Sequence, residues 1–300
     1  MAVHQVIQAT RKTGTTVRRL LAATAICAAV LGATPAHAQQ AAQPAQTAPP
    51  APRERDPDQN LDALQPDFTL LALPTTLRLP RYKMAFRVTH RFGRPLGQGD
   101  FGDLASDFFA LDSSAQIGLE LRFGLMRGTQ GGIYRTNDRT IEFFVEHNVM
   151  QESDSRPLGL NAYAAIDGTN NFTDSYSPAL GAIISRKVRR LGAFYAEPIW
   201  VNNSNLLPSE IVDHNNSFLL GIGARVRVRR TVYVVAETAP RVAGYDPGTT
   251  YWAAGVEKLV GGHMFQINVS NSVGTTISQI ARGGSHDTFL GFNITRKFWR

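Results

Sequence analysis

The chain has 300 residues, of which 43% are hydrophobic and 18% charged, with a formal net charge of +7. Four of its 31 lysines and arginines lie in the first 38 residues, which contain no acid, so 27 bases and 24 acids follow. That near balance gives no case for nucleic-acid binding, which needs a clustered basic face. The single cysteine, Cys27, lies in the same N-terminal stretch, so the rest of the chain has neither disulfide nor thiol chemistry.

The first 38 residues have the composition of a secretory signal peptide. Basic residues precede an apolar run from Leu20 to Leu31, and Ala36-His37-Ala38 has the form of a signal-peptidase site. We predict cleavage after Ala38. A retained membrane helix is the alternative, but an apolar run of about a dozen residues is short of the roughly 20 that span a bilayer.

Residues 39–60 are rich in glutamine, alanine and proline and contain no large apolar side chain. Such a segment cannot bury enough surface to offset the entropy of ordering, so we predict a disordered leader. Residues 61–300 contain no comparable linker, and we predict that they form a single domain.

This domain is built from segments in which apolar and polar residues alternate with a period of two. In residues 82–92, Met84, Phe86 and Val88 share one face, while Arg87 and Arg91 point to the other. Successive side chains of a strand project to opposite faces, so the pattern predicts β-strands and an all-β fold. The alternating segments are 82–92, 116–125, 140–149, 157–166, 178–187, 192–201, 217–229, 231–240, 251–260, 263–272 and 288–298.

The length of these strands and of their connections indicates a membrane barrel. Residues 217–229 alternate over about a dozen positions, whereas a soluble strand has about 5–6 residues and a tilted membrane strand about 9–11. Connections near 189–191, 229–230 and 261–262 are short, and those at 167–177, 202–216, 241–250 and 274–287 are long. Short turns at one end and long loops at the other are typical of outer-membrane barrels, whereas a soluble sandwich has no reason to sort its loops. We therefore predict a closed antiparallel transmembrane β-barrel.

Bacterial single-chain barrels have even numbers of strands, and the eleven segments need a twelfth. We assign it to residues 70–80, "LLALPTTLRLP", which places the tight turns on the periplasmic side. With this assignment, residues 97–114 become a long periplasmic connection with a short helix. The last segment, 288–298, is similar to the terminal strands that barrel-assembly machinery recognises, although Trp299 and Arg300 follow its last phenylalanine.

The polar faces of these strands carry charges that we predict to point into the lumen, because an arginine facing lipid near the midplane costs about 2–4 kcal/mol. We expect Arg225 and Arg227 to pair with Glu237 and Glu257. The set is either a structural ladder that fills a narrow barrel or the lining of a pore or polar cavity. Its members are Arg87, Arg91, Glu120, Arg122, Glu142, Glu146, Arg225, Arg227, Glu237 and Glu257.

No catalytic, cofactor-binding or metal-binding motif is predicted. The histidines after residue 38 are scattered without zinc-ligand spacing, and there is no G-x-S-x-G elbow or haem motif. A phospholipase barrel needs a serine, a histidine and an asparagine on its outer wall. His147 and Asn148 are the nearest approach to that set, and no serine partner is identifiable.

Several blocks in order resemble one known family: "LPRYKMAFRVTHRFGRPL", "DGTNNFTDSYSPALGAIISR", "EPIWVNNSN", "GYDPG" and "GGHMFQINVSNSVGTTISQIARGG". They are similar to the bacterial β-barrel family called domain of unknown function 5777, over roughly Leu73–Phe298. The resemblance implies a single outer-membrane-type barrel. It supplies no substrate and no catalytic residue.

The sequence therefore predicts an outer-membrane barrel, most simply a narrow channel or solute-transport barrel with a charged lumen. A structural or docking barrel for an exported partner is the alternative, and an outer-membrane hydrolase is less favoured. The expected partners are outer-membrane lipid, the barrel-assembly machinery and an unidentified small solute. We expect no nucleic acid and no cofactor.

Overall fold

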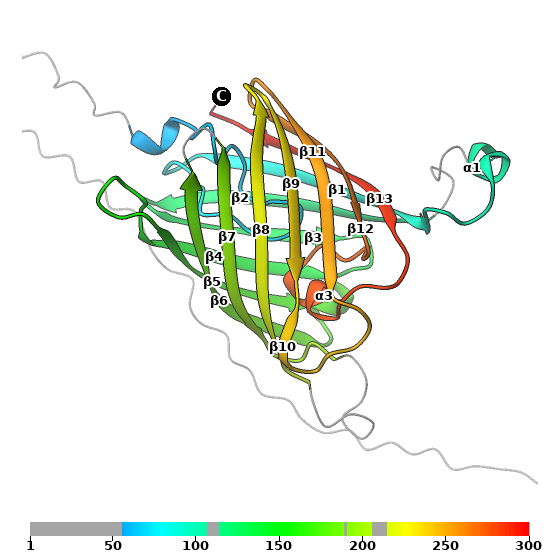
Figure 1. The fold of residues 1–300 in the computed structure, drawn as a ribbon. Helices are drawn as coiled ribbons and strands as arrows, with labels where there is room; N and C mark the ends of the chain where they lie inside the picture. The colour runs from blue at the N-terminus through cyan, green and yellow to red at the C-terminus, as the bar shows by residue number, and fades with distance from the viewer. Residues whose placement is uncertain (1–55, 107–113, 189–190, 206–214, 300) are drawn as a thin grey trace, which may run out of the picture. The chain divides into compact units, whose positions relative to one another are not determined.

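The structure is a computed structural model that describes residues 56–106, 114–188, 191–205 and 215–299 (Figure 1). The predicted signal peptide and most of the predicted leader lie outside these residues. The elements are η1 Pro57–Gln59, β1 Met84–Pro95, α1 Phe101–Ser106, β2 Ala115–Met126, β3 Thr129–Thr136, β4 Ile141–Met150, β5 Gly159–Gly168, α2 Thr169–Phe172, β6 Tyr176–Val188, β7 Gly192–Val201, β8 Ser217–Arg229, β9 Val232–Ala239, β10 Arg241–Gly244, β11 Tyr251–Val260, β12 His263–Ser270, α3 Ile277–Ala281 and β13 Phe289–Lys297.

The strands form one antiparallel sheet that closes on itself, as predicted. From β1 to β9 each strand pairs with the next along the chain, β9 pairs with β11, and β11, β12 and β13 pair in order. The sheet closes where β1 pairs with β13, with Val88 opposite Ile294. Both β9 and β10 pair with β8, so they are one strand interrupted at Pro240. The described residues therefore make a closed barrel of twelve strands, which confirms the predicted fold class.

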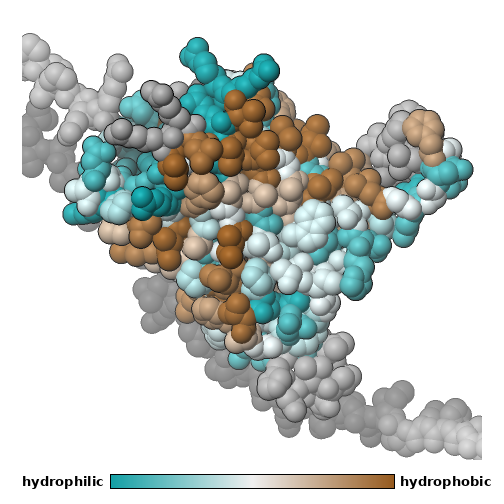
Figure 2. All heavy atoms as spheres, viewed as in Figure 1, coloured by the Kyte–Doolittle hydropathy of each residue, from teal (hydrophilic) through white to brown (hydrophobic). Residues whose placement is uncertain are grey.

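The alternation along each strand separates an outer apolar face from an inner polar one. On β8, Ile222 and Val228 are exposed, whereas Gly223 and Arg225 between them are buried. Figure 2 shows apolar side chains across the outer face of the sheet and hydrophilic side chains gathered at the end that carries the β8–β9 and β11–β12 turns. An apolar belt with a hydrophilic rim suits a barrel embedded in lipid.

One strand was missed in the sequence. β3, "TQGGIYRT", pairs with β2 and β4 along its length. Its glycines Gly131 and Gly132 weaken the alternation, because they carry no side chain to mark either face. Gly132 is required by close packing, since a Cβ there would lie 2.4 Å from the Leu121 carbonyl oxygen and 2.6 Å from the Phe144 ring.

The assignment of residues 70–80 as the twelfth strand is wrong. This segment lies inside the barrel, with Leu70, Leu71 and Leu73 buried, and its isolated bridge joins Thr69 to Pro74 of the same segment. Pro74 and Pro80 lack the N–H that a central strand donates. Three leucines within four residues also leave this segment without the polar face that a barrel strand turns to the lumen.

The corrected strands reverse the position of the connection between β1 and β2. This connection, which includes α1, lies at the end that carries the longer loops, together with those before β6, β8, β11 and β13. The opposite end carries the short turns, and both β1 and β13 have their chain-terminal ends there. We name these the long-loop end and the short-turn end. The prediction that residues 97–114 lie at the end of the tight turns is therefore wrong. Residues 70–80 do not cross the barrel before this connection, and β3 is an additional strand that crosses it afterwards.

Residues 56–60, expected at the end of the leader, are ordered into η1. Asp56 caps this turn by accepting a hydrogen bond from the Asp58 N–H at 3.0 Å, and Pro57 supplies a preset backbone angle. The Asp58 carboxylate pairs with Arg78. Local capping and this ion pair outweigh the polar composition of residues 56–60. No helix among the described residues is long and apolar enough to cross a membrane.

Candidate functional site: the barrel interior

The interior gathers nine of the ten charged side chains singled out from the sequence, and these nine are buried. Arg227, near the short-turn end of β8, is only half-buried. In an environment of low polarity each charge needs a partner, because an unpaired buried ion carries the full cost of leaving water. The contacts of each residue therefore indicate how the interior is built.

One cluster joins three strands. Arg87 of β1 contacts the Glu120 carboxylate of β2 at 2.7 Å. Arg122, two residues further along β2, contacts Glu120 at 2.8 Å and Glu146 of β4 at 3.2 Å. Two arginines thus neutralise two glutamates, and amide donors from Gln130 and Asn161 complete the shell of Glu146.

A second ion pair joins two strands of the wall that are separated by β9. Arg225 of β8 donates to both oxygens of Glu257 on β11, at 2.7 and 2.9 Å, and both side chains are fully buried. Gln266 of β12 donates to the same carboxylate at 2.7 Å. The expected partnership of Arg225 with a following strand is present in this geometry.

The other expected pairings are absent from the geometry of the described residues. Arg227 donates to the Arg230 carbonyl oxygen at 3.0 Å, because β8 carries it to the turn rather than into the interior. Glu237 of β9 accepts the Tyr251 hydroxyl at 2.6 Å and the backbone N–H groups of Leu71, Ala72 and Leu73 at 2.9, 2.8 and 3.2 Å. Its partner is backbone from the interior segment, not arginine.

That interior segment, residues 61–81, is named here the plug. Its backbone hydrogen bonds close within itself, for example Leu70 N–H to Leu73 O at 2.8 Å and Thr75 N–H to Phe68 O at 2.8 Å. Among the described residues, no backbone hydrogen bond joins residues 61–80 to a barrel strand. The wall holds the plug through side chains instead.

Side chains from many strands serve this purpose. Arg225 donates to the Thr69 carbonyl oxygen at 2.6 Å, Gln266 to Leu70 O at 2.7 Å and Asn293 to Leu71 O at 2.9 Å. Arg91, fully buried on β1, donates to the Asn293 side-chain oxygen at 2.8 Å and so helps to orient the amide that contacts Leu71. The polar lining therefore satisfies the polar backbone that enters the barrel.

The plug also fits the wall by shape. A Cβ at Gly223 would lie 2.1 Å from the Leu70 side chain, and one at Gly221 would lie 3.1 Å from the Leu73 side chain. These two inward-facing glycines of β8 leave room for two leucines. Leu70, Leu71 and Leu73 belong to the same buried apolar cluster as Tyr163, Ile183 and Ile199 of the wall.

From the long-loop end, α3 fills the interior. All five of its residues are buried, and Thr276 caps it by accepting the Gln279 N–H at 3.3 Å. Thr276 also donates to Asp167 at 2.6 Å, and Ile277 N–H donates to Glu142 at 3.2 Å. A void of about 20 Å³ lies between the plug and α3, enough for about one water molecule.

The β3–β4 turn braces α3 through Asp138. Burial alone would raise the pKa of Asp138, but hydrogen bonds from Thr136 and Thr140 lower it below its ordinary value. The ionised carboxylate accepts from Gln279 at 2.8 Å. The closure at this end thus depends on polar contacts, like the seat of the plug.

Besides Asp58 of η1, sequence reasoning missed four buried charges of the plug and the wall: Asp67, Asp167, Glu197 and Lys297. Lys297 contacts Asp67 of the plug at 2.8 Å. Burial alone would raise the pKa of Asp67, but Lys297, Arg225 and a hydrogen bond from Thr295 hold it below its ordinary value. Lys297 shares the polar face of β13 with Asn293, so the alternation rule could have found it. Asp67 precedes the predicted strands and carried no periodic signal.

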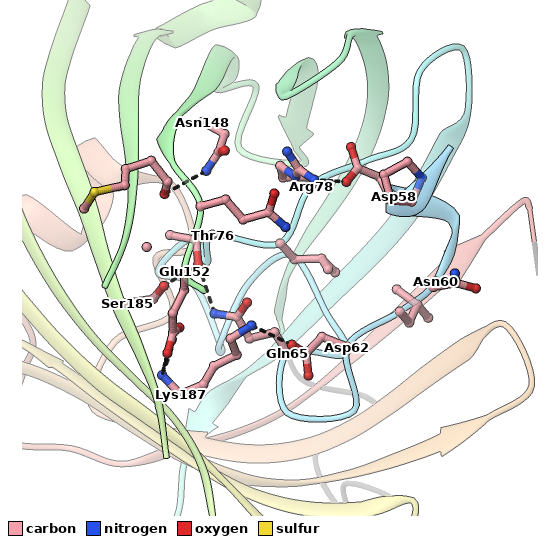
Figure 3. A pocket seen from close by; sticks show the side chains of 16 residues that line it. Asp58, Asn60, Asp62, Gln65, Thr76, Arg78, Asn148, Glu152, Ser185 and Lys187 are labelled. Atoms are coloured by element: carbon pink, nitrogen blue, oxygen red, sulfur yellow. Dashed lines mark hydrogen bonds and ion pairs between the residues drawn. The ribbon is translucent and has the colours of Figure 1, made fainter. Parts of the chain in front are cut away.

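A polar pocket of about 330 Å³ lies beside the plug at the short-turn end (Figure 3). The Lys187 side chain of β6 contacts Asp62 of the plug at 2.8 Å, and the Lys187 backbone N–H donates to the Glu152 carboxylate at 2.9 Å. Gln65 donates to Thr76 at 2.9 Å, and Thr76 is bonded to the Ser185 hydroxyl at 2.6 Å. The pocket marks where the start of the plug meets the wall with polar contacts that water can reach.

The outer wall carries His147, as the alternation placed it. Its Nδ1 lies 2.7 Å from the Thr129 hydroxyl, and the neighbouring Asn148 side chain donates to Asn161 and to the Met150 carbonyl oxygen. These contacts turn Asn148 away from the imidazole. The described residues also contain no cluster of histidine, cysteine, aspartate or glutamate that could hold a metal ion.

Comparison with known proteins shows a match to one protein family. The model of the family described as "membrane bound beta barrel domain", the domain of unknown function 5777, matches residues 67–298. No curated protein matches the sequence. Among solved structures, the chain is similar to the NanC porin with a TM-score of 0.48, 8% identity and coverage of 71% of this chain and 99% of that one.

Two further structures are similar at the same level. An outer membrane channel of Pseudomonas putida F1 has a TM-score of 0.45 and 11% identity, with 73% of this chain and 97% of that one covered. The outer membrane phospholipase A of Escherichia coli has a TM-score of 0.44 and 11% identity, with 79% and 98% covered. Identities this low do not indicate a shared function.

Proposed function

The chain belongs to the family of membrane-bound beta barrel domains, and from that premise we propose that it is an outer-membrane channel closed by its own plug. Opening consists of withdrawal of residues 61–81 from the lumen, together with displacement of α3. The protein then serves passage of a solute rather than catalysis.

The observation that carries this proposal is the way in which the plug is attached. Side chains hold it, and no backbone hydrogen bond among the described residues ties residues 61–80 to a strand. Withdrawal therefore leaves every described strand pair intact. The polar groups that the plug uncovers, such as Glu237, Gln266 and Asn293, are groups that water solvates as the lumen fills.

The connection of the plug to the barrel supports the same proposal. Tyr82 N–H donates to the Gly124 carbonyl oxygen at 2.8 Å, which anchors the chain directly after the plug at the short-turn end. The other end of the plug continues into η1 and the residues before it. A force or a ligand acting on that side withdraws the plug without unfolding the sheet.

A permanently closed structural or docking barrel is the competing function. It fits the paired arginines and glutamates, which stiffen the wall whether or not a pore opens. It does not account for a lumen filled by a segment that makes no strand pairs, because a barrel that never opens gains more from a regular paired filling or from larger side chains on the wall.

Conductance in planar lipid bilayers tests the proposal with three proteins: the mature chain, a variant lacking residues 61–81, and a variant that also has residues 275–282 replaced by a glycine–serine linker. We expect the mature chain to stay closed apart from rare openings, the first variant to open intermittently and the second to conduct steadily. Heat-modifiable migration on gels establishes that each barrel is folded. A folded double variant that does not conduct overturns the channel function.

A matched pair of point substitutions tests the plug seat without a deletion. Gly223→Met fills the space over which Leu70 lies, whereas Ala224→Met adds the same side chain to the outer face of the same strand. We expect Gly223→Met to raise the open probability and Ala224→Met to leave it unchanged. Equal behaviour of the two variants contradicts the role of the seat.

A further inference from the structure

The wall of the barrel carries an excess of acids over bases. Twelve charged side chains of the described strands are buried, seven acids and five bases, which leaves two acids in excess. The acids are Glu120, Glu142, Glu146, Asp167, Glu197, Glu237 and Glu257, and the bases are Arg87, Arg91, Arg122, Arg225 and Lys297. The clusters described above pair Glu120, Glu146 and Glu257 with Arg87, Arg122 and Arg225.

Among the remaining acids, Glu197 of β7 has no hydrogen-bond or ion-pair partner in the part of the chain that the structure describes. Its side chain is fully buried, and neither carboxylate oxygen has a hydrogen-bond partner among the described residues. Its Cβ lies beside Gly221, where Leu73 of the plug also packs. The plug therefore covers a carboxyl group that the wall leaves without a counterion.

Glu142 and Asp167 lie opposite each other on β4 and β5, and both are buried. The groups that donate to them come from the α3 segment: Thr276 and Ser278 donate to Asp167, and the Ile277 N–H donates to Glu142. In the closed barrel this pair of acids is therefore held by polar groups of α3, which leave when α3 is displaced.

The acids that have no base partner on the wall and the bases that have no acid partner on the wall lie on different parts of it. Glu142, Asp167, Glu197 and Glu237 come from β4, β5, β7 and β9, whereas Arg91 and Lys297 come from the neighbouring strands β1 and β13. Once the plug leaves, Lys297 loses its partner Asp67 and becomes, like Arg91, a base without an acid partner on the wall. Four acids on one side then face two bases on the other.

We infer that the open lumen conducts cations in preference to anions. This inference rests on the channel function proposed above and names its substrate class, small positively charged solutes. Entry of water lowers the cost of ionising the carboxyl groups that the plug and α3 had covered. A narrow lumen with low-dielectric walls concentrates counter-ions of the opposite sign, and acidic linings are how cation pores select.

The test uses the double variant that lacks the plug and α3, and measures its reversal potential in a KCl gradient at neutral pH. We expect the sign of a cation-selective pore. Replacing all four of these acids (Glu142→Gln, Asp167→Asn, Glu197→Gln and Glu237→Gln) changes the wall from two acids in excess to two bases in excess, so the sign of the reversal potential should invert.

Two further variants keep the test decisive. Glu197→Gln alone breaks no hydrogen bond of the described residues, so it folds even if the fourfold variant does not, and it should reduce the cation preference. Asp154→Asn removes one acid from the exposed β4–β5 turn and should leave the selectivity unchanged. Conduction without cation preference, or with equal selectivity in Glu197→Gln, overturns this inference alone. Absence of conduction in the folded double variant overturns the channel function itself.

Discussion

At the scale of single residues, Arg225 and Arg227 show that the same pattern on one strand can hold two different roles. Both belong to the polar face of β8, yet Arg225 is fully buried against Glu257, and Arg227 reaches only the Arg230 carbonyl oxygen near the turn. Alternation identifies the face of a residue. It does not give its depth, because depth depends on where the strand begins and on which strands surround it.

This difference predicts unequal effects on stability. Arg225→Met leaves the buried Glu257 carboxylate uncompensated and should lower the free energy of unfolding by about 3–5 kcal/mol. Arg227→Met removes a rim contact and should change it by no more than about 0.5 kcal/mol. Urea unfolding of the refolded barrel in liposomes measures both. Equal losses would show that burial along β8 is not as described.

A pH effect follows from Asp67. Its pKa in the closed barrel lies below the ordinary value of about 3.9, since Lys297 and Arg225 more than offset the effect of burial. A group with a depressed pKa stabilises the closed state above about pH 4, and this contribution is lost as the pH falls through the lower value. Plug retention should therefore weaken below about pH 4, seen as a rising open probability in bilayers.

Substitutions separate this effect from general acid unfolding. Asp67→Asn leaves Lys297 buried without its counterion, so the open probability should already be high at neutral pH and should change less on acidification. The double variant Asp67→Asn with Lys297→Met removes both charges and should restore the closed state. If Asp67→Asn stays as closed as the parent protein, the pair does not hold the plug.

The inner charges of long, regular strands could be predicted from the sequence, and those in mixed contexts could not. Glu120 lies between Leu119 and Leu121, two large apolar neighbours that mark the opposite face. On β8, Ile222, Val226 and Val228 mark the face opposite Arg225. Glu197 lies in "GAFYAEPIWV", where both faces carry apolar or small residues, so no contrast distinguishes them. The inward face there is apolar because it packs on the plug, which includes contacts such as Ile199 with the leucine cluster.

At the scale of elements, eleven of the twelve strands were predicted from the sequence. Residues 70–80 were taken for the twelfth, which is in fact β3. Residues 70–80 are apolar enough for a strand, and β3 has too few side chains to look like one. Their environments explain both cases: Leu70 and Leu73 fill glycine seats on β8, while Gly132 of β3 lets the Phe144 ring lie against the sheet. In each case a glycine on one segment matches a large side chain on another, a relation between distant segments that periodicity does not record.

The short helix α3 provides a prediction at this scale. Thr276 caps it and donates to Asp167, so Thr276→Ala removes a cap and leaves a buried acceptor with one donor fewer. The free energy that protects the α3 amides from hydrogen exchange should fall by about 1–3 kcal/mol. Thr276→Ser keeps the hydroxyl and should retain most of the protection. Equal exchange in the two variants would show that the cap does not hold α3.

At the scale of the whole molecule, the sorting of connections by length was predicted correctly for most of the chain and wrongly for residues 97–114. Each strand crosses the barrel, so the end at which a connection lies depends on the number of strands before it. The false strand at residues 70–80 placed residues 97–114 at the wrong end. The missed β3 then cancelled this error, so the later connections were placed at the correct ends. Loop sorting is a property of the entire chain. A single strand assigned wrongly therefore affects every connection up to the next compensating error.

This sorting predicts how the barrel is oriented in the outer membrane. The long-loop end should face outward, and the short-turn end, with the plug and both termini of the barrel, should face the periplasm. Gly97 and Gly261 are suited to a test, since each has a positive φ and open space around its Cβ position, and they lie at opposite ends. An epitope inserted after Gly97 should bind antibody on intact cells. The same epitope after Gly261 should bind only once the membrane is permeabilised.

The pair of insertions is informative in every outcome, because both sites tolerate added residues for the same reason. Antibody access at Gly261 and not at Gly97 would mean that the barrel is inserted the other way, with the plug entering from outside. Recovery of both tagged proteins in the soluble periplasmic fraction without detergent would mean that the apolar outer face does not contact lipid. With the expected result, withdrawal of the plug occurs toward the periplasm, so a signal that opens the channel must act from the cell's own side of the membrane.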